Sequence, residues 1–169
     1  MIYVCPLSKI EETVALSGAR RMVTLLNAGT PVTRPANLRR ADHLILSMND
    51  IVVEQPDMTP PGENHVRKLL DFARSWDRRA PLLVHCFAGI SRSTAAAYIV
   101  TAALAPQRDE AEIAATLRRL SPSATPNLRL ISIADRLLER EGRMVDAIES
   151  IGRGAEAFEG VPFALKIDR

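Results

Sequence analysis

Cysteine is scarce in this sequence. Its only two cysteines, Cys5 and Cys86, lie far apart. They show neither the paired spacing of a zinc site nor the dense pattern of a disulfide framework. We therefore expect no structural metal and no disulfide scaffold. A reducing compartment, the cytoplasm, is the simplest location for such a chain.

Long hydrophobic runs and concentrated charge are lacking as well. The start of the chain, MIYVCPLSKIEET, has no basic stretch followed by an apolar core of signal-peptide length, and its apolar run stops at Pro6. Nor does any stretch approach the roughly 18 to 20 apolar residues of a membrane span. The 22 basic and 20 acidic residues form no basic tract, since the arginines are spread along the chain. These absences predict neither a membrane nor a nucleic acid as partner.

The length and the apolar content favour one globular domain. With 169 residues, of which 47% are hydrophobic, the chain can bury one full core. Short apolar runs that predict buried strands occupy residues 2–4, 22–27, 43–48 and 81–85. Helical patterns occupy residues 9–18, 62–76, 93–105, 109–120, 126–142 and 143–152. In the longest of these, Pro126 stands in the first turn and Gly142 at the end.

Strands and helices alternate in the first half, and helices alone follow residue 90. This order predicts an α/β fold with a mostly parallel central sheet of four to five strands, flanked by helices and completed by a helical C-terminal half. We expect a single domain over residues 1–160. Residues 161–169 carry little pattern, and we expect a C-terminal tail there.

The stretch LLVHCFAGISRSTAAA, residues 82–97, concentrates the chemistry of the chain. It reads as a buried strand that runs into a tight loop and opens a long helix. Such a turn directs backbone N–H groups and the positive end of a helix dipole at one point, which makes an anion site. Cys86 stands at its base. A helix N-terminus and a nearby cation both favour the thiolate, the nucleophilic form of cysteine.

Three further residues fit this interpretation. Arg92 lies six positions after Cys86 and returns to the same place if the loop curls, so that its planar guanidinium can grip two oxygens of an oxyanion. Gly89 permits the backbone conformation of a tight loop. Ser93 can donate a hydrogen bond to the sulfur. By contrast, His43 and His65 have no evident partners, and we expect surface or core roles for them.

The segment HCFAGISRS resembles the signature of the cysteine-dependent protein tyrosine phosphatase superfamily, which is His-Cys, five residues, Arg and Ser. The likeness is greatest to its dual-specificity and bacterial tyrosine-phosphatase-like branch. The resemblance implies hydrolysis of phosphate monoesters through a phosphocysteine on Cys86, with Ser93 easing departure of the sulfur and His85 orienting the loop. It further implies that phosphate is held by Phe87, Ala88, Gly89, Ile90, Ser91 and Arg92. Neither a metal nor an organic cofactor is implied.

The family also needs a general acid, normally an aspartate on a mobile loop. Asp50 follows a strand and stands 36 residues before Cys86, whereas Asp57 stands 29 residues before it in a proline-rich loop. We favour Asp50, because NDI at a strand end resembles the family pattern better, and keep Asp57 as the alternative. In dual-specificity relatives a Pro-Asn before the late helix braces the phosphate loop, which implies that role for Asn127.

The resemblance implies a phosphorylated protein or a small phosphate ester as substrate, and phosphate or sulfate as a ligand of the loop. Phosphotyrosine in proteins is the default, and the uncharged residues 87–91 argue against a phosphoinositide. Two other functions remain open. One is a catalytically weak phosphate-binding protein, and the other is a redox or sulfur-transfer enzyme that uses Cys86. Nothing in the sequence specifies an oligomeric state.

Overall fold

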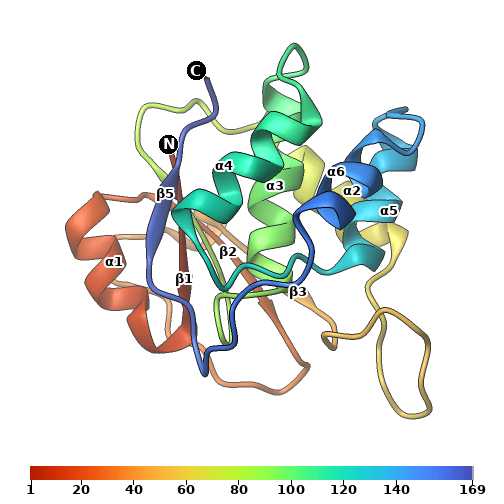
Figure 1. Ribbon diagram of the computed structural model, residues 1–169. Helices are drawn as coiled ribbons and strands as arrows, with labels where there is room; N and C mark the ends of the chain where they lie inside the picture. The colour runs from red at the N-terminus through yellow and green to blue at the C-terminus, as the bar shows by residue number, and fades with distance from the viewer. Residues whose placement is uncertain (169) are drawn as a thin grey trace.

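A computed structural model describes residues 1–168 and contains one five-stranded sheet with helices on both faces (Figure 1). The strands are β1 (Ile2–Pro6), β2 (Arg21–Leu26), β3 (His43–Ser47), β4 (Leu82–Cys86) and β5 (Phe163–Leu165). Their order across the sheet is β3-β2-β4-β1-β5. The first four run parallel, and β5 is antiparallel to β1. The predicted α/β architecture is therefore confirmed.

The helices separate into two layers. Helix α1 (Ile10–Ser17) packs on one face of the sheet, where Ile10 and Val14 join the smaller apolar cluster. The other face carries α2 (Glu63–Arg74), α3 (Arg92–Leu104), α4 (Glu110–Leu120), α5 (Leu128–Leu137) and α6 (Arg143–Ile151) (Figure 1). Short 3-10 turns precede α1, at Leu7–Lys9, and β3, at Arg40–Asp42. No helix in the described residues is long and apolar enough to cross a bilayer.

The centre of the fold is the unit formed by β4 and α3. All five residues of β4 are buried, because the strand lies between β1 and β2 and helices cover both faces. Eleven of the 13 residues of α3 are buried too, as its apolar composition predicted. The short loop between these two elements, residues 87–91, is therefore held at the carboxyl edge of the sheet by the most deeply buried parts of the chain.

The predicted helix over residues 126–142 is too long. Helix α5 ends at Leu137, and both Glu139 and Glu141 have positive φ angles, 55° and 54°, which break the helix. Gly142 instead precedes α6. The carboxylate of Asp135 accepts hydrogen bonds from Gly142 N–H at 2.7 Å and Met144 N–H at 2.8 Å, which satisfies the first donors of the new helix.

A fifth strand lies where the sequence predicts a tail. Residues Phe163–Leu165 form β5, which pairs with Ile2, Tyr3 and Val4 of β1. Phe163 and Leu165 are buried, whereas Ala164 between them is half-buried. Three alternating residues are too short a pattern to stand out in a sequence. The strand exists because β1 offers it an unpaired edge.

Candidate active site

The loop between β4 and α3 folds tightly because residue 89 is glycine. Gly89 has a φ of +69°, in the left-handed region. A Cβ atom there would lie 2.7 Å from Pro6 N and 2.8 Å from the carbonyl carbon of Cys5. Both are backbone atoms of β1 and cannot move aside. Glycine is therefore required by conformation and by space.

The loop turns its carbonyl oxygens outward. Four of them accept backbone hydrogen bonds from neighbouring segments. The pairs are Leu7 N–H to Phe87 O at 3.0 Å, Gly160 N–H to Ala88 O at 2.7 Å, Thr125 N–H to Ile90 O at 3.0 Å and Asn127 N–H to Ser91 O at 3.3 Å. Every peptide bond of the described residues is trans, so each N–H group points opposite to the preceding carbonyl. The N–H groups of residues 88, 89, 91 and 92 consequently face the inside of the loop and form a nest of donors for an anion.

The sulfur of Cys86 lies inside this nest. Gly89 N–H donates to Cys86 Sγ at 3.2 Å, and Ser93 Oγ lies 3.1 Å from the same sulfur. The sulfur thus has an N–H group and a hydroxyl within hydrogen-bonding distance. The sulfur also lies before the first turn of the 13-residue helix α3, whose dipole is positive at that end. The arrangement predicted for the thiol and Ser93 is present.

Arg92 is buried with one end of its guanidinium fixed. Its Nη1 donates to Asn27 Oδ1 and to the Met48 carbonyl, both at 2.7 Å. Its Nε is buried and has no hydrogen-bond partner among the described residues. A buried donor without an acceptor costs about 1–3 kcal/mol, so this Nε is available to an acceptor that enters the loop.

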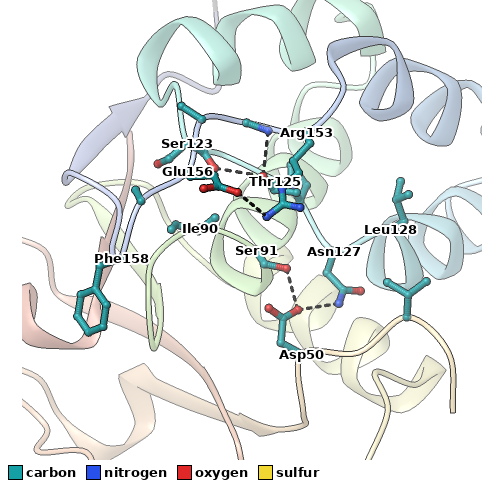
Figure 2. Close-up of a pocket in the computed structure, with 15 residues that line it drawn as sticks. Asp50, Ile90, Ser91, Ser123, Thr125, Asn127, Leu128, Arg153, Glu156 and Phe158 are labelled. Carbon is teal, nitrogen blue, oxygen red and sulfur yellow. Dashed lines mark hydrogen bonds and ion pairs between the residues drawn. The ribbon is translucent and has the colours of Figure 1, made fainter. Parts of the chain in front are cut away.

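Asp50 and Asn127 meet beside the loop (Figure 2). Asp50 Oδ1 accepts hydrogen bonds from Ser91 Oγ at 2.7 Å and from Asn127 Nδ2 at 2.8 Å. Asn127 is in turn fixed as the N-cap of α5, since its Oδ1 accepts from Leu130 N–H at 3.0 Å. Its own N–H bonds the Ser91 carbonyl. Asn127 thus connects the loop with Asp50, which extends the bracing contact that the resemblance implied.

The alternative acid, Asp57, is not part of this cluster. It is exposed, with a φ of +59°, at the tip of the loop that follows Asp50. Asn49 and Thr59 close that loop through two hydrogen bonds, of 2.8 Å and 2.9 Å. The structure therefore joins Asp50 to the loop through Ser91, whereas no hydrogen bond in the described residues joins the Asp57 side chain to it.

His85 is buried beneath the loop in a defined tautomer. Its burial lowers the pKa to about 4, so the ring is neutral at pH 7. Nδ1 lies 3.3 Å from the Cys86 carbonyl, which only accepts, so Nδ1 carries the proton. Nε2 lies 2.6 Å from Thr24 Oγ1 and must then accept from that hydroxyl. His85 therefore donates a hydrogen bond to the carbonyl of Cys86.

The hydrogen-bond chain continues to a second histidine. Thr24 Oγ1 also lies 2.7 Å from His43 Nε2. Because Thr24 uses its single proton on His85, His43 Nε2–H must be the donor to Thr24. Sequence analysis assigned no partner to His43 and did not consider Thr24. The one sequence signal for Thr24 was its polar side chain inside the apolar run of β2. Residues 1–168 hold no cluster of His, Cys, Asp or Glu side chains able to bind a metal.

A cleft of about 820 Å³ adjoins the loop. Asp50, Ile90 and Ser91 lie on one side of it, and residues 153–158 on the other (Figure 2). The second wall is held in place by Ala155 N–H, which donates to the Pro122 carbonyl at 2.9 Å, and by the Gly160 contact with the loop. Sequence analysis did not predict this wall, because residues 152–160 show no periodic pattern.

Comparison with known proteins supports the resemblance. The sequence profile of the protein-tyrosine phosphatase family matches residues 54–123, which include Cys86 and Arg92 but not Asp50. No curated protein sequence matches the chain. The predicted resemblance to the cysteine-dependent phosphatases is confirmed by this match together with the fold of the solved structures that are similar to the chain.

Three of these structures illustrate the shared fold. Human DUSP28 aligns with a TM-score of 0.63 at 17% identity, over 83% of this chain and 92% of its own. The human tyrosine phosphatase-like serine/threonine/tyrosine-interacting protein gives a TM-score of 0.62 at 17% identity, over 83% and 92%. PTPMT1 in complex with PI(5)P gives a TM-score of 0.61 at 15% identity, over 83% and 94%. At these identities the likeness establishes the architecture.

Proposed function

We propose that this chain, which has the fold and the loop sequence of the cysteine-dependent protein tyrosine phosphatases, hydrolyses phosphate monoesters through a phosphocysteine intermediate. One observation carries the proposal. Inside the loop, Gly89 N–H donates to Cys86 Sγ, and the buried Arg92, six positions after Cys86, keeps an Nε that has no partner among the described residues. A tetrahedral phosphoryl group supplies the acceptors that these donors lack.

In the first step, the thiolate of Cys86 attacks phosphorus and forms a P–S bond while the bond to the leaving oxygen breaks. The N–H groups of the loop and the guanidinium of Arg92 hold the three other oxygens as charge develops on them. Asp50, placed beside the loop by Ser91 and Asn127, gives a proton to the leaving oxygen. An alcohol or phenol departs.

In the second step, the carboxylate of Asp50 accepts a proton from water, and the water oxygen attacks phosphorus. The P–S bond breaks, and its electron pair returns to Cys86. Ser93 Oγ, 3.1 Å from the sulfur, donates a hydrogen bond to the departing thiolate. Inorganic phosphate leaves, and the proton on Asp50 is ready for the next cycle.

Protein phosphotyrosine is the substrate that we propose, with dual specificity as the alternative. The loop is uncharged over residues 87–91, so it offers no cation to the additional phosphates of an inositide. A redox role fits less well. Burial raises the pKa of Cys5, the second cysteine, to about 12, which keeps it as an unreactive thiol near neutral pH.

A phosphate-binding protein without turnover is the second candidate. Its supporting observation is that Asp50 Oδ1 is already engaged by two hydrogen bonds, from Ser91 Oγ and Asn127 Nδ2. In that case the loop would bind a phosphorylated ligand without releasing the leaving group.

Hydrolysis of p-nitrophenyl phosphate separates these possibilities, with wild type, Cys86→Ser, Asp50→Asn and Asp57→Asn compared side by side. We expect turnover by the wild type, none by Cys86→Ser, a loss of roughly 10²–10⁴-fold in Asp50→Asn and little change in Asp57→Asn. A wild type that binds phosphate without turnover would favour the second candidate. Loss in Asp57→Asn with a normal rate in Asp50→Asn would reverse the assignment of the acid.

A further inference from the structure

Four exposed hydrophobic side chains border the catalytic loop. Phe87 belongs to the loop and is 55% exposed, and Val161 follows Gly160, whose N–H bonds the Ala88 carbonyl, and is 81% exposed. Val52 and Phe158 line the adjoining cleft and are 49% and 88% exposed. We call these four residues, Val52, Phe87, Phe158 and Val161, the apolar rim.

The apolar rim is fixed relative to the loop. A Cβ atom on Gly160 would lie 2.8 Å from the Gly89 carbonyl oxygen, so the segment that carries Phe158 and Val161 lies directly against the loop backbone. Single exposed hydrophobic residues are ordinary on protein surfaces, but several on one loop, on the segment packed against it and in the adjoining cleft indicate a binding surface. Aromatic side chains in particular are frequent anchors of interfaces.

The charged side chains of the cleft indicate which class of ligand binds there. Its charged side chains are Asp50, Glu156 and Arg153, which makes two acids and one base. Arg153 Nη2 already lies 3.7 Å from Glu156 Oε1. Such a lining does not attract a polyphosphorylated headgroup or an anionic membrane, both of which need several cations. It accommodates a polypeptide with apolar side chains.

We propose that the apolar rim binds hydrophobic side chains next to the phosphorylated residue of a protein substrate. The inference rests on the proposed function and names its substrate class, which is phosphoproteins whose phosphorylated residue has hydrophobic neighbours. Burial of Phe158 and Val161 against those neighbours removes apolar surface from water, which strengthens binding of the peptide outside the loop. The loop itself recognises only the phosphoryl group.

Binding and turnover test the proposal separately. Two phosphotyrosine peptides are compared, one with leucine and phenylalanine beside the phosphotyrosine and one with serine at the same positions. Kd is measured by calorimetry on Cys86→Ser proteins with and without Phe158→Ser plus Val161→Ser. Turnover of both peptides and of p-nitrophenyl phosphate is measured on the same variants with Cys86 intact. Leu16→Ser, which replaces an 80% exposed leucine of α1 on the other face of the sheet, is the control.

We expect the apolar peptide to bind about ten-fold tighter than the serine peptide, and the double rim variant to lose that preference, whereas Leu16→Ser keeps it. In turnover, the double rim variant should have a lower kcat/KM than the wild type on the apolar peptide, and this loss should exceed any loss on p-nitrophenyl phosphate by about ten-fold. Equal binding of both peptides to the starting protein, or a preference retained in the rim variant, would overturn the proposal. If the rim variant instead lost binding to phosphatidylserine vesicles, the rim would be a membrane contact, and the proposal would be wrong.

Peptide binding without any hydrolysis by the protein with Cys86 intact would refute the proposed function. The preference in Kd would still decide the role of the apolar rim, since the calorimetric comparison does not depend on turnover.

Discussion

Replacement of Thr24 by valine tests the hydrogen-bond chain under the loop. Valine matches the shape of threonine but removes the hydroxyl that donates to His85 Nε2 at 2.6 Å and accepts from His43 Nε2 at 2.7 Å. His85 is fully buried, so its nitrogen would lose its only partner with no water to replace it. His43 is half-buried, and water can compensate there. The substitution therefore leaves one buried acceptor, His85 Nε2, without a hydrogen bond.

An unsatisfied buried polar group costs about 1–3 kcal/mol. We expect Thr24→Val to lower the free energy of unfolding by that amount, measured by urea denaturation. In a protein of this size each kcal/mol lowers the melting temperature by roughly 2–4 °C. The size of the effect follows from the burial of His85 rather than from the number of hydrogen bonds removed.

Thr13→Val is the matched control. Thr13 is equally buried, but its hydroxyl faces the Cys5 thiol, which is a weak hydrogen-bond partner. The same substitution there should change the free energy of unfolding by less than about 0.5 kcal/mol or raise it. If Thr24→Val and Thr13→Val behaved alike, the chain from His43 to the Cys86 carbonyl would contribute nothing, and the tautomer assigned to His85 would lose its support.

Three further predictions concern the same region. Burial lowers the pKa of His85 to about 4, below the ordinary 6.5, so the unfolded chain takes up the proton at a higher pH than the folded protein does. The free energy of unfolding should therefore fall by about 3 kcal/mol as the pH drops from 6.5 to 4, and it should fall by less in His85→Gln. An equal fall in both proteins would show that His85 does not cause it. Gly89→Ala should abolish hydrolysis of p-nitrophenyl phosphate and weaken phosphate binding, because its Cβ would clash with the backbone at Pro6 and Cys5; normal activity would mean that the loop tolerates another conformation. Asn127→Ala should lower the free energy of unfolding by about 1 kcal/mol, because α5 loses its cap, and should slow turnover. Asn127→Asp should keep the cap but slow turnover, because the new carboxylate repels Asp50. A normal rate in both variants would show that Asp50 does not need the contact with Asn127.

Features that depend on neighbouring residues could be predicted from the sequence. The strands appeared as short apolar runs, and Asp109 was predicted to start a helix; its carboxylate accepts from Glu112 N–H at 3.0 Å, which confirms the prediction. The tight loop between β4 and α3 was predicted for the same reason. His85, Cys86, Gly89, Arg92 and Ser93 lie within nine consecutive residues, and the strand before them and the helix after them fix their arrangement.

Features that depend on distant residues could not be predicted. Strand β5 forms only because the edge of β1 is free to pair with three residues more than 150 positions away. The sequence favoured Asp50 over Asp57 but could not show the contact with Asn127, which lies 77 positions after Asp50 and reaches it through the turn before α5. The wall of the cleft depends on hydrogen bonds to residues far away in the sequence, among them Gly160 N–H to the Ala88 carbonyl and Ala155 N–H to the Pro122 carbonyl.

The sequence by itself determined the tight loop after β4 and the position of Cys86 at its base, because a strand, a glycine turn and a helix start are local structures. Only the tertiary structure decided what surrounds them. The parallel register that sets Thr24 beside His85 joined a second histidine, His43, to His85 through the Thr24 hydroxyl, although His43 stands 42 positions before His85. Sheet register and loop docking depend on packing across the whole domain, and no local pattern of residues encodes them.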